Sequence, residues 1–304
     1  MSLKFSIIIP LYNKESSVVK TLDSVLLQSY KDYEIVLVND GSTDSSLSVV
    51  ENYFSNNKDI DSQIITTENK GVSEARNIGV EHAKNDFVAF LDADDIWEPN
   101  HLETLVRLIN EYPLAVLWST DVGYMYGNQK VDLPNRFNEV NGYIDDFFVS
   151  KRGKNIFCVC TSVFRKSVFQ EMGGYDARIR IGEDLDLAWR VISTHKVAHA
   201  FVTTMYYVQD AENRAMHRKH NLENRLSYYI EKYDSYRINE DFSRYLDNYC
   251  VNECTECLLQ GEDYKMIKRI LSRVSFRNVK PYSLFRLIMA KLKYKLCLIP
   301  VTKA

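Results

Sequence analysis

The stretch FVAFLDADDIWEP, residues 87–99, sets a run of apolar residues directly before three aspartates. The first five residues predict a strand that is buried on both faces, as the strands of a parallel sheet are. Asp92, Asp94 and Asp95 then follow within four residues. Like charges at the end of a buried strand repel one another and lose hydration. These carboxylates therefore need a positively charged partner.

Apolar runs and helical spacing alternate through the first 120 residues, around this stretch. The runs that predict strands are at 5–9, 34–38, 64–66, 87–91 and 115–119. The segments with helical spacing are at 16–28, 43–54, 72–83 and 100–111. Short connections between them predict βαβ units, and hence an α/β fold with a Rossmann-like, mostly parallel sheet flanked by helices.

Beyond residue 120 the pattern changes twice. Residues 121–205 mix strand-like and helix-like segments, and helical spacing dominates from residue 221 onward. We therefore expect one domain at 1–210 and a helical, basic C-terminal region at 211–304.

The composition is that of an ordinary globular protein, since 45% of the 304 residues are hydrophobic and 26% are charged. Six cysteines are too few for a disulfide scaffold, and their spacing predicts no zinc site, which favours reduced thiols. No apolar stretch reaches the roughly 18 residues of a membrane span, and the first eleven residues lack the architecture of a signal peptide. We expect a cytoplasmic location, at the inner face of the membrane if the tail binds lipid.

The net charge of −3 conceals an uneven distribution. No acidic residue follows Asp263, whereas eleven lysines and arginines do, and the segment 282–299 mixes apolar and cationic residues at helical spacing. Two interpretations stay open. The helix packs on the acidic part of the same chain or on a second copy in a homodimer, or it makes a peripheral contact with an anionic membrane. Nucleic acid is not an expected partner, because the tail lacks aromatic stacking platforms in a recognisable fold.

Ligands of open parallel sheets bind at the carboxyl ends of the strands. The residues predicted near that edge include Pro10, Tyr12, Glu15, Asp40, Asn69, Arg76, Asp92 and Asp94. An aspartate such as Asp40 accepts a ring N–H of a base, and Tyr12 stacks on the base. Asp92 and Asp94 offer the hard oxygen ligands that suit Mg²⁺ or Mn²⁺. The edge therefore predicts a nucleotide that carries a metal ion.

Each of these residues also has an ordinary structural interpretation. Asp40, with Gly41 and Ser42, fits a turn and a helix cap. Asp95 is either a third carboxylate of the site or the cap of the helix after Pro99. Two other nucleotide-binding designs are not supported, because neither G-x-G-x-x-G nor G-x-x-x-x-G-K-[ST] occurs.

Five segments stand in one order and spacing: SIIIPLYNKE, EIVLVNDGSTD, ENKGVSEARNIGV, FLDADD and IGEDLDLAWR. They resemble the inverting nucleotide-sugar glycosyltransferases of family 2, and the resemblance covers about residues 4–205. It implies a GT-A fold, a nucleotide-diphospho-sugar donor that is usually a UDP-sugar, and a divalent metal, Mn²⁺ or Mg²⁺. By position, it implies that Pro10, Tyr12 and Glu15 flank the nucleoside.

The same resemblance implies roles for further residues. Asp40 would bind the uracil, and Asn69 and Arg76 would lie along the nucleotide. Asp92 and Asp94 match the D-x-D metal motif of the family, and Asp92 would also contact the nucleotide.

An acceptor hydroxyl that attacks opposite the leaving group needs a base away from the metal. Glu183 and Asp184, within IGEDLDLAWR, open a predicted helix. The resemblance points to Asp184 as the base and to Glu183 as a ligand of acceptor or sugar hydroxyls. The plain alternative is that both carboxylates stabilise the N-terminus of their helix.

One segment departs from the family pattern. Many relatives carry a tyrosine-arginine-x-histidine stretch after the last strand, whereas this chain has Gln209 and Asp210 in that region. Arg214 or His217 would have to substitute, so a third protein ligand for the metal stays open.

Together these features predict a metal-dependent, inverting glycosyltransferase of the hexosyltransferase type. It would transfer a sugar from a nucleotide-diphospho-sugar to a hydroxyl of a glycan or lipid-linked acceptor, in the synthesis of a surface polysaccharide or cell-envelope glycan. The alternative is a nucleotide-sugar-binding protein without transfer activity, in a regulatory or scaffolding role. Only the enzyme needs Asp184 as a base.

Overall fold

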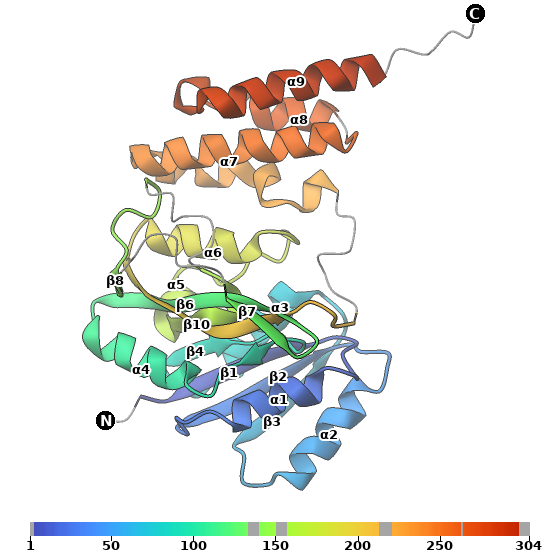
Figure 1. Cartoon of the computed structure of the whole chain (residues 1–304), viewed down its shortest axis with the longest axis vertical. Coiled ribbons are helices and arrows are strands. Elements are labelled where there is room, and N and C mark those ends of the chain that lie inside the picture. Colours follow the sequence, from blue (N-terminus) through green and yellow to red (C-terminus); the bar gives the residue numbers. More distant parts are fainter. Residues whose placement is uncertain (1–2, 133–139, 150–156, 213–220, 263, 298–304) are drawn as a thin grey trace, which may run out of the picture. The chain divides into compact units, whose positions relative to one another are not determined.

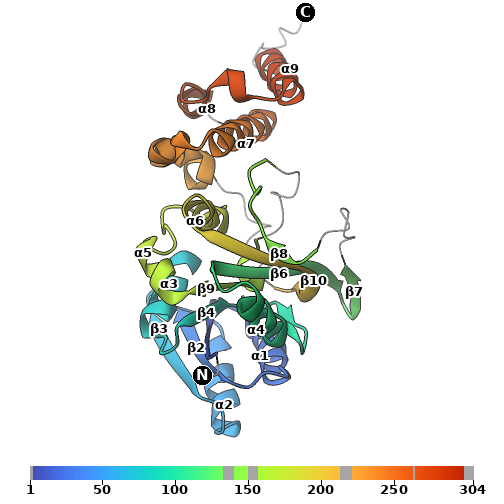
Figure 2. The ribbon, with the colours of Figure 1, turned by 90° about the vertical axis from the view of Figure 1, so that its left-hand side faces the viewer.

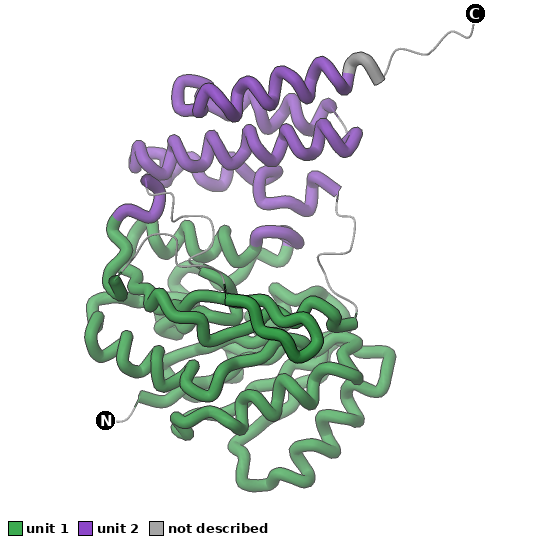
Figure 3. Tube along the Cα trace, in the orientation of Figure 1, with its two compact units in different colours: residues 1–145, 154–177, 183–218 green, residues 146–153, 178–182, 219–304 purple. Residues whose placement is uncertain are grey.

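The computed structural model of the chain describes residues 3–132, 140–149, 157–212, 221–262 and 264–297. The chain consists of two compact units (Figure 3). Unit 1 comprises residues 1–145, 154–177 and 183–218, and unit 2 comprises residues 146–153, 178–182 and 219–304. The units interleave along the chain, and the division expected at residue 210 stays a prediction.

Unit 1 is built on one sheet with helices on both faces. Its strands are β1 (Phe5–Leu11), β2 (Tyr33–Asp40), β3 (Ser62–Thr67), β4 (Phe87–Phe90), β5 (Ile96–Trp97), β6 (Ala115–Tyr126), β7 (Gln129–Asp132), β8 (Gly142–Tyr143), β9 (Ser162–Arg165) and β10 (Lys196–Val208). Its α-helices are α1 (Val18–Leu26), α2 (Ser46–Asn56), α3 (Val72–His82), α4 (His101–Glu111), α5 (Lys166–Glu171) and α6 (Glu183–Ile192). A short 3₁₀ helix, Val159–Thr161, precedes β9.

The strand order is β3-β2-β1-β4-β9-β6-β10-β5, with β7 beside β6 and β8 beside β10. The first four strands of this order pair in parallel. Strand β9 is antiparallel to both β4 and β6, while β6 and β10 run parallel. Helices α1 and α4 cover one face of the sheet and α3 covers the other (Figure 2). The expected α/β class is therefore confirmed.

Burial on both faces explains why the first strands are continuous apolar runs. All seven residues of β1 and all four of β4 are buried. Helix α3 packs directly on β1 and β2, since a Cβ at Gly79 would lie 2.3 Å from Cγ2 of Ile8. The carboxyl ends of these parallel strands consequently meet at one edge, where the predicted site residues follow them.

The later strands differ from the pattern in the sequence. Strand β6 runs without a break for 12 residues, beyond the apolar run at 115–119, and β10 runs for 13 residues with register shifts after Ala200. Strand β9 enters between β4 and β6. Apolar periodicity marks buried strands but does not give their order, so this insertion was not predicted.

Unit 2 is helical, as expected for the C-terminal region. It contains the 3₁₀ helices Leu222–Asn224, Leu226–Ile238 and Phe276–Asn278, and the α-helices α7 (Glu240–Leu259), α8 (Tyr264–Leu271) and α9 (Pro281–Cys297). Helix α7 packs against both α8 and α9 (Figure 1). The 3₁₀ helix Leu226–Ile238 is broken by a kink at Tyr229. Among the described residues, no helix is long and apolar enough to cross a membrane.

Candidate active site

Arg76 joins the end of β4 to the start of α6. Its Nη2 lies 2.6 Å from Oδ1 of Asp92, and its Nη1 lies 3.0 Å from Oε1 of Glu183. Arg76 is only 2% exposed, and its guanidinium lies 5.4 Å from the centroid of the Tyr175 ring. Burial lowers the pKa of Arg76, but Asp92 and Glu183 outweigh it and hold that pKa well above the usual value. The positive charge of Arg76 thus forms ion pairs with two carboxylates that are far apart in the sequence.

Glu183 and Asp184 stand side by side in the first turn of α6 and have different partners. Burial and the neighbouring Asp184 raise the pKa of Glu183 to about 7, although Arg76 opposes the rise. Burial also raises the pKa of Asp184, against the effect of the Leu185 N–H, which donates to its Oδ1 at 2.8 Å. Among the described residues Asp184 forms no ion pair, whereas Glu183 is paired with Arg76. Asp184 therefore keeps an oxygen that can accept a proton.

Polar side chains fix the turn that presents Tyr175 to this group. Asn77 on α3 binds both the N–H and the C=O of Tyr175 at 2.9 Å. Gly174 has a φ of 64°, and a Cβ there would lie 2.6 Å from Oδ1 of Asn77, so this position requires glycine. Arg190 donates to the C=O of Gly174 at 2.7 Å and pairs with Asp186 at 2.7 Å.

Asp94 is paired with a cation of the chain itself. Nζ of Lys14 lies 2.6 Å from Oδ2 of Asp94 and also donates to the C=O of Glu212. The two charged side chains are 11% and 17% exposed. Burial raises the pKa of Asp94, and Lys14 opposes the rise. Arg76 and Lys14 thus supply the positive charges that the aspartates after β4 require.

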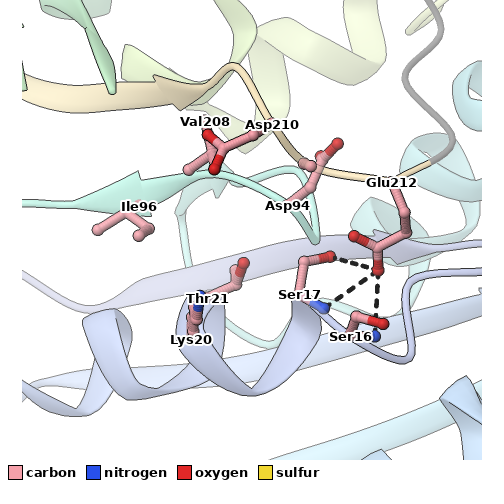
Figure 4. Close-up of a pocket in the computed structure, with 10 residues that line it drawn as sticks. Ser16, Ser17, Lys20, Thr21, Asp94, Ile96, Val208, Asp210 and Glu212 are labelled. Carbon is pink, nitrogen blue, oxygen red and sulfur yellow. Dashed lines mark hydrogen bonds between the residues drawn. The ribbon is translucent and has the colours of Figure 1, made fainter. Parts of the chain in front are cut away.

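A pocket lies beside Asp94, and Glu212 lines it (Figure 4). Oε1 of Glu212 accepts hydrogen bonds from the N–H groups of Ser16 and Ser17, both at 3.1 Å, and from Oγ of Ser17 at 3.0 Å. These donors lie at the N-terminus of α1, where the helix dipole favours a carboxylate. Glu212, which follows β10, therefore contacts the N-terminus of α1. Its C=O also accepts from Lys14, which pairs with Asp94 after β4.

Asp95 does not cap α4, because the N-cap of that helix is Asn100. Asp95 is 4% exposed, and its Oδ1 accepts the N–H of Val208 at 3.2 Å. Sγ of Cys160 donates to Oδ2 of Asp95 at 3.5 Å. Burial raises the pKa of Asp95 well above its usual value, and the two neighbouring aspartates add to the rise. Asp95 therefore ties the end of β10 to the loop after β4.

The donor atoms at this strand end fit a divalent cation. One ligand atom each from Asp92, Asp95 and Cys160 lie within 4.8 Å of one another. Carboxylate oxygens suit Mg²⁺ and Mn²⁺, whereas the thiol of Cys160 is a softer group whose pKa burial raises well above its usual value. Asp94 turns to Lys14 instead, so the expected metal pair of Asp92 and Asp94 stays a prediction.

Asp40 ends β2 and holds the loop before α3. It is 4% exposed, and its two carboxylate oxygens accept the N–H groups of Lys70 and Gly71 at 2.8 and 2.9 Å. A carboxylate has about four lone-pair sites, so Asp40 retains capacity for the N–H of a base.

The other predicted nucleoside neighbours lie at the same strand ends. Pro10 is buried within β1, Tyr12 is half-buried just after it, and Asn69 is exposed before α3. Glu15 is exposed, and its Oε2 accepts the N–H of Ser45, the N-cap of α2, at 2.8 Å. The sequence did not suggest this capping contact, and the nucleotide-binding roles of these residues stay predictions.

Three residues of the site were missed in the sequence. Lys14 stands shortly after the end of β1 within SIIIPLYNKE, and its place near a strand end was a usable signal. Nothing local marks Glu212 or Cys160, because each reaches the site from far along the chain. The proposed substitutes for the missing histidine, Arg214 and His217, lie outside the described residues.

Comparison with known proteins decides the family. The sequence profile of Glycosyl transferase family 2 matches residues 6–173, which is more than half of the chain. The chain belongs to glycosyltransferase family 2. The matched region includes Asp40, Arg76 and the D-x-D motif and ends before Glu183, so the family assignment rests on the strand-end half of the site.

Several curated glycosyltransferases are similar in sequence to part of this chain. Glycosyltransferase GlyA of Streptococcus pneumoniae is 42% identical over 111 residues, which are 36% of this chain and 15% of GlyA. GlyG of the same organism is 34% identical over 133 residues, which are 43% of this chain and 42% of GlyG. The uncharacterised glycosyltransferase RP339 of Rickettsia prowazekii is 25% identical over 237 residues, covering 75% of this chain and 71% of RP339. The chain therefore spans less than half the length of GlyA and GlyG.

Solved structures confirm the GT-A fold. S. aureus TarS 1–349 in complex with UDP-GlcNAc superposes with a TM-score of 0.60 at 18% identity, covering 96% of this chain and 80% of the TarS chain. Mannosyltransferase PcManGT from Pyrobaculum calidifontis, in complex with GDP-Man and Mn²⁺, superposes with a TM-score of 0.57 at 19% identity, covering 97% of this chain and 76% of that chain. At these identities the likeness establishes the family fold alone.

Proposed function

We propose that this chain is an inverting, metal-dependent glycosyltransferase that moves a hexose from a UDP-sugar to a hydroxyl of a glycan or lipid-linked acceptor. The observation that carries the proposal is the bridge from Asp92 through Arg76 to Glu183, because it sets the strand-end carboxylates beside those of α6. A cytoplasmic location and a part in surface-polysaccharide or cell-envelope glycan synthesis belong to the same proposal.

The nucleoside would lie at the ends of β1 and β2. Tyr12 would stack on the base, and the remaining acceptor capacity of Asp40 would take a ring N–H of uracil. Pro10, Glu15 and Asn69 would flank the nucleoside from the same edge. The complexes of TarS with UDP-GlcNAc and of PcManGT with GDP-Man support a nucleotide-sugar donor for this chain as well.

Mn²⁺ or Mg²⁺ would be held by Asp92 and Asp94, with Cys160 beside Asp92. When bound, such an ion stabilises the negative charge that develops on a leaving diphosphate. Lys14 holds Oδ2 of Asp94, so its ammonium would compete with the ion for that carboxylate. The Mn²⁺ in the PcManGT complex supports a metal requirement.

Asp184 is the better base of the two carboxylates on α6. An oxygen of Glu183 is bound to buried Arg76, whereas Asp184 forms no ion pair within the described residues. The raised pKa of Asp184 makes it a stronger base than an ordinary aspartate. It would take the proton of the acceptor hydroxyl, while Glu183 and Arg76 hold the sugar or acceptor hydroxyls in place.

Replacing Asp184 with asparagine tests this assignment. Loss of a general base lowers turnover by about 10²–10⁴-fold. We expect that loss in the release of UDP from UDP-GlcNAc or another UDP-sugar, while calorimetry finds donor binding nearly unchanged. Glu183→Gln is the matched control, because it also removes one α6 carboxylate but leaves Asp184 in place, and it should retain more activity.

Two results would decide against the proposal. Transfer at the wild-type rate by Asp184→Asn would show that another group is the base. If the wild-type protein binds UDP-sugars and transfers none to water or to any acceptor, the chain is a nucleotide-sugar-binding protein.

A further inference from the structure

Helix α9 in unit 2 is apolar on two opposite sides. Its inner side packs on α7 through Ser283, Leu287 and Ala290, which are 6%, 1% and 2% exposed. The ring of Tyr294 stacks on that of Tyr264, with the centroids 5.8 Å apart. The inner side of α9 is therefore the side that packs against the rest of unit 2.

The outer side of α9 carries five large apolar residues that are largely exposed. They are Tyr282 at 72%, Phe285 at 59%, Ile288 at 49%, Met289 at 50% and Leu292 at 51%. Spacings of three and four residues put them on one face of the helix, which we call the outer stripe. Single exposed apolar residues are ordinary, but a continuous stripe of five marks an interaction surface.

The charges around the outer stripe favour a negatively charged partner. The helical repeat of about 3.6 residues puts Lys291 on one side of the stripe and Lys293 on the other. Arg286 forms an ion pair with Glu256 on α7 at 2.5 Å, so its charge is already balanced. No acidic residue follows Asp263, so the helix has no negative charge of its own to balance these lysines.

A second copy of the chain fits this surface poorly. Joining two outer stripes would bring the lysines of both copies together, and like charges across an interface oppose association. An anionic lipid surface satisfies both features at once, because its phosphates attract lysine while its acyl boundary accepts apolar side chains.

We propose that the outer stripe of α9 binds the surface of an anionic membrane. Phe285, Met289 and Leu292 would enter the boundary between headgroups and acyl chains, and Lys291 and Lys293 would contact lipid phosphates. The contact is interfacial, since no helix of the described residues could span the bilayer. The proposal rests on unit 2 alone and does not depend on sugar transfer.

The test is co-sedimentation of the full chain with lipid vesicles, without any nucleotide sugar. Equal parts of phosphatidylglycerol and phosphatidylcholine give the anionic vesicle, and phosphatidylcholine alone gives the neutral one. We expect binding to the anionic vesicle, weakened by high salt because salt screens the lysines. The variant Phe285→Ser with Met289→Ser should bind at least about tenfold more weakly, because it removes two inserted side chains.

Leu114→Ser is the matched control, since Leu114 is 67% exposed in unit 1 and lies outside the stripe. It should bind vesicles like the wild type, and circular dichroism should show all variants folded. Absence of binding to the anionic vesicle, or equal binding by the double variant, would overturn the proposal. So would a dimer seen in sedimentation without lipid and dissolved by the double variant, because the stripe would then be an interface between copies.

Discussion

Replacing Arg76 with methionine tests whether one buried guanidinium organises the site. Its terminal nitrogens lie 2.6 Å from Asp92 and 3.0 Å from Glu183, and the residue is 2% exposed. Methionine removes the charge while filling much of the volume. Removing one partner of a buried ion pair costs about 3–5 kcal/mol, because Glu183 and the half-buried Asp92 lose their counter-charge. That loss corresponds to a fall in melting temperature of roughly 6–20 °C for a unit of this size.

Urea unfolding followed by tryptophan fluorescence measures this loss. Trp97, Trp118 and Trp189 are all buried in unit 1, so the signal reports on the unit that holds Arg76. Arg107→Met is the matched control: Arg107 is exposed on α4 and donates to Thr104 at 3.3 Å, so its loss should cost no more than about 0.5 kcal/mol.

A second substitution separates charge balance from packing. Adding Glu183→Gln to Arg76→Met should recover about 1–3 kcal/mol, because one of the unpaired carboxylates is removed. A loss below about 1 kcal/mol for Arg76→Met would refute the reasoning, as would a double variant no more stable than the single one.

Two further perturbations probe the same cluster. Glu183 has a pKa of about 7 in the fold against 4.5 ordinarily, so it contributes stability that is present below about pH 4.5 and lost as pH rises through 7. Between about pH 5.5 and about pH 8 the wild type should therefore lose about 2 kcal/mol more than Glu183→Gln in urea unfolding, and equal losses would contradict this pKa. Lys14→Met should tighten Mn²⁺ binding by about 10- to 150-fold in calorimetry, since the ion no longer displaces a charged hydrogen bond of about 1.5–3 kcal/mol. An unchanged Mn²⁺ affinity would show that the ammonium does not compete for Asp94.

The strand-end half of the site could be located from the sequence because of how parallel sheets are built. Buried parallel strands are continuous apolar runs, and their carboxyl ends share one edge. Asp40 and Asp92 follow such runs directly, so their common edge could be predicted before their contacts were known. The binding of uracil by Asp40 and the binding of a metal ion by Asp92 stay predictions.

Contacts made across the fold could not be predicted in the same way. Lys14 meets Glu212 across 198 positions, and Asp92 meets Cys160 across 68 positions. Strand order decides which of these residues meet. Strand β9 lies between β4 and β6, and β10 lies on the other side of β6, so residues near these strands come close to the end of β4. Periodicity carries no information on that order. Helical spacing was expected from residue 221 onward, and residues Leu226–Ile238 form a kinked 3₁₀ helix there, a distinction that the spacing does not make.

The account as a whole depends on the aspartates after β4 binding a cation and, through it, the diphosphate of a nucleotide sugar. Calorimetric titration of UDP-GlcNAc into the wild type and Asp94→Asn, with Mn²⁺ and then with a chelator, tests this most directly. We predict that chelation weakens binding to the wild type at least about tenfold, and that Asp94→Asn binds weakly in both conditions. Full affinity without metal, or in Asp94→Asn, would contradict the account.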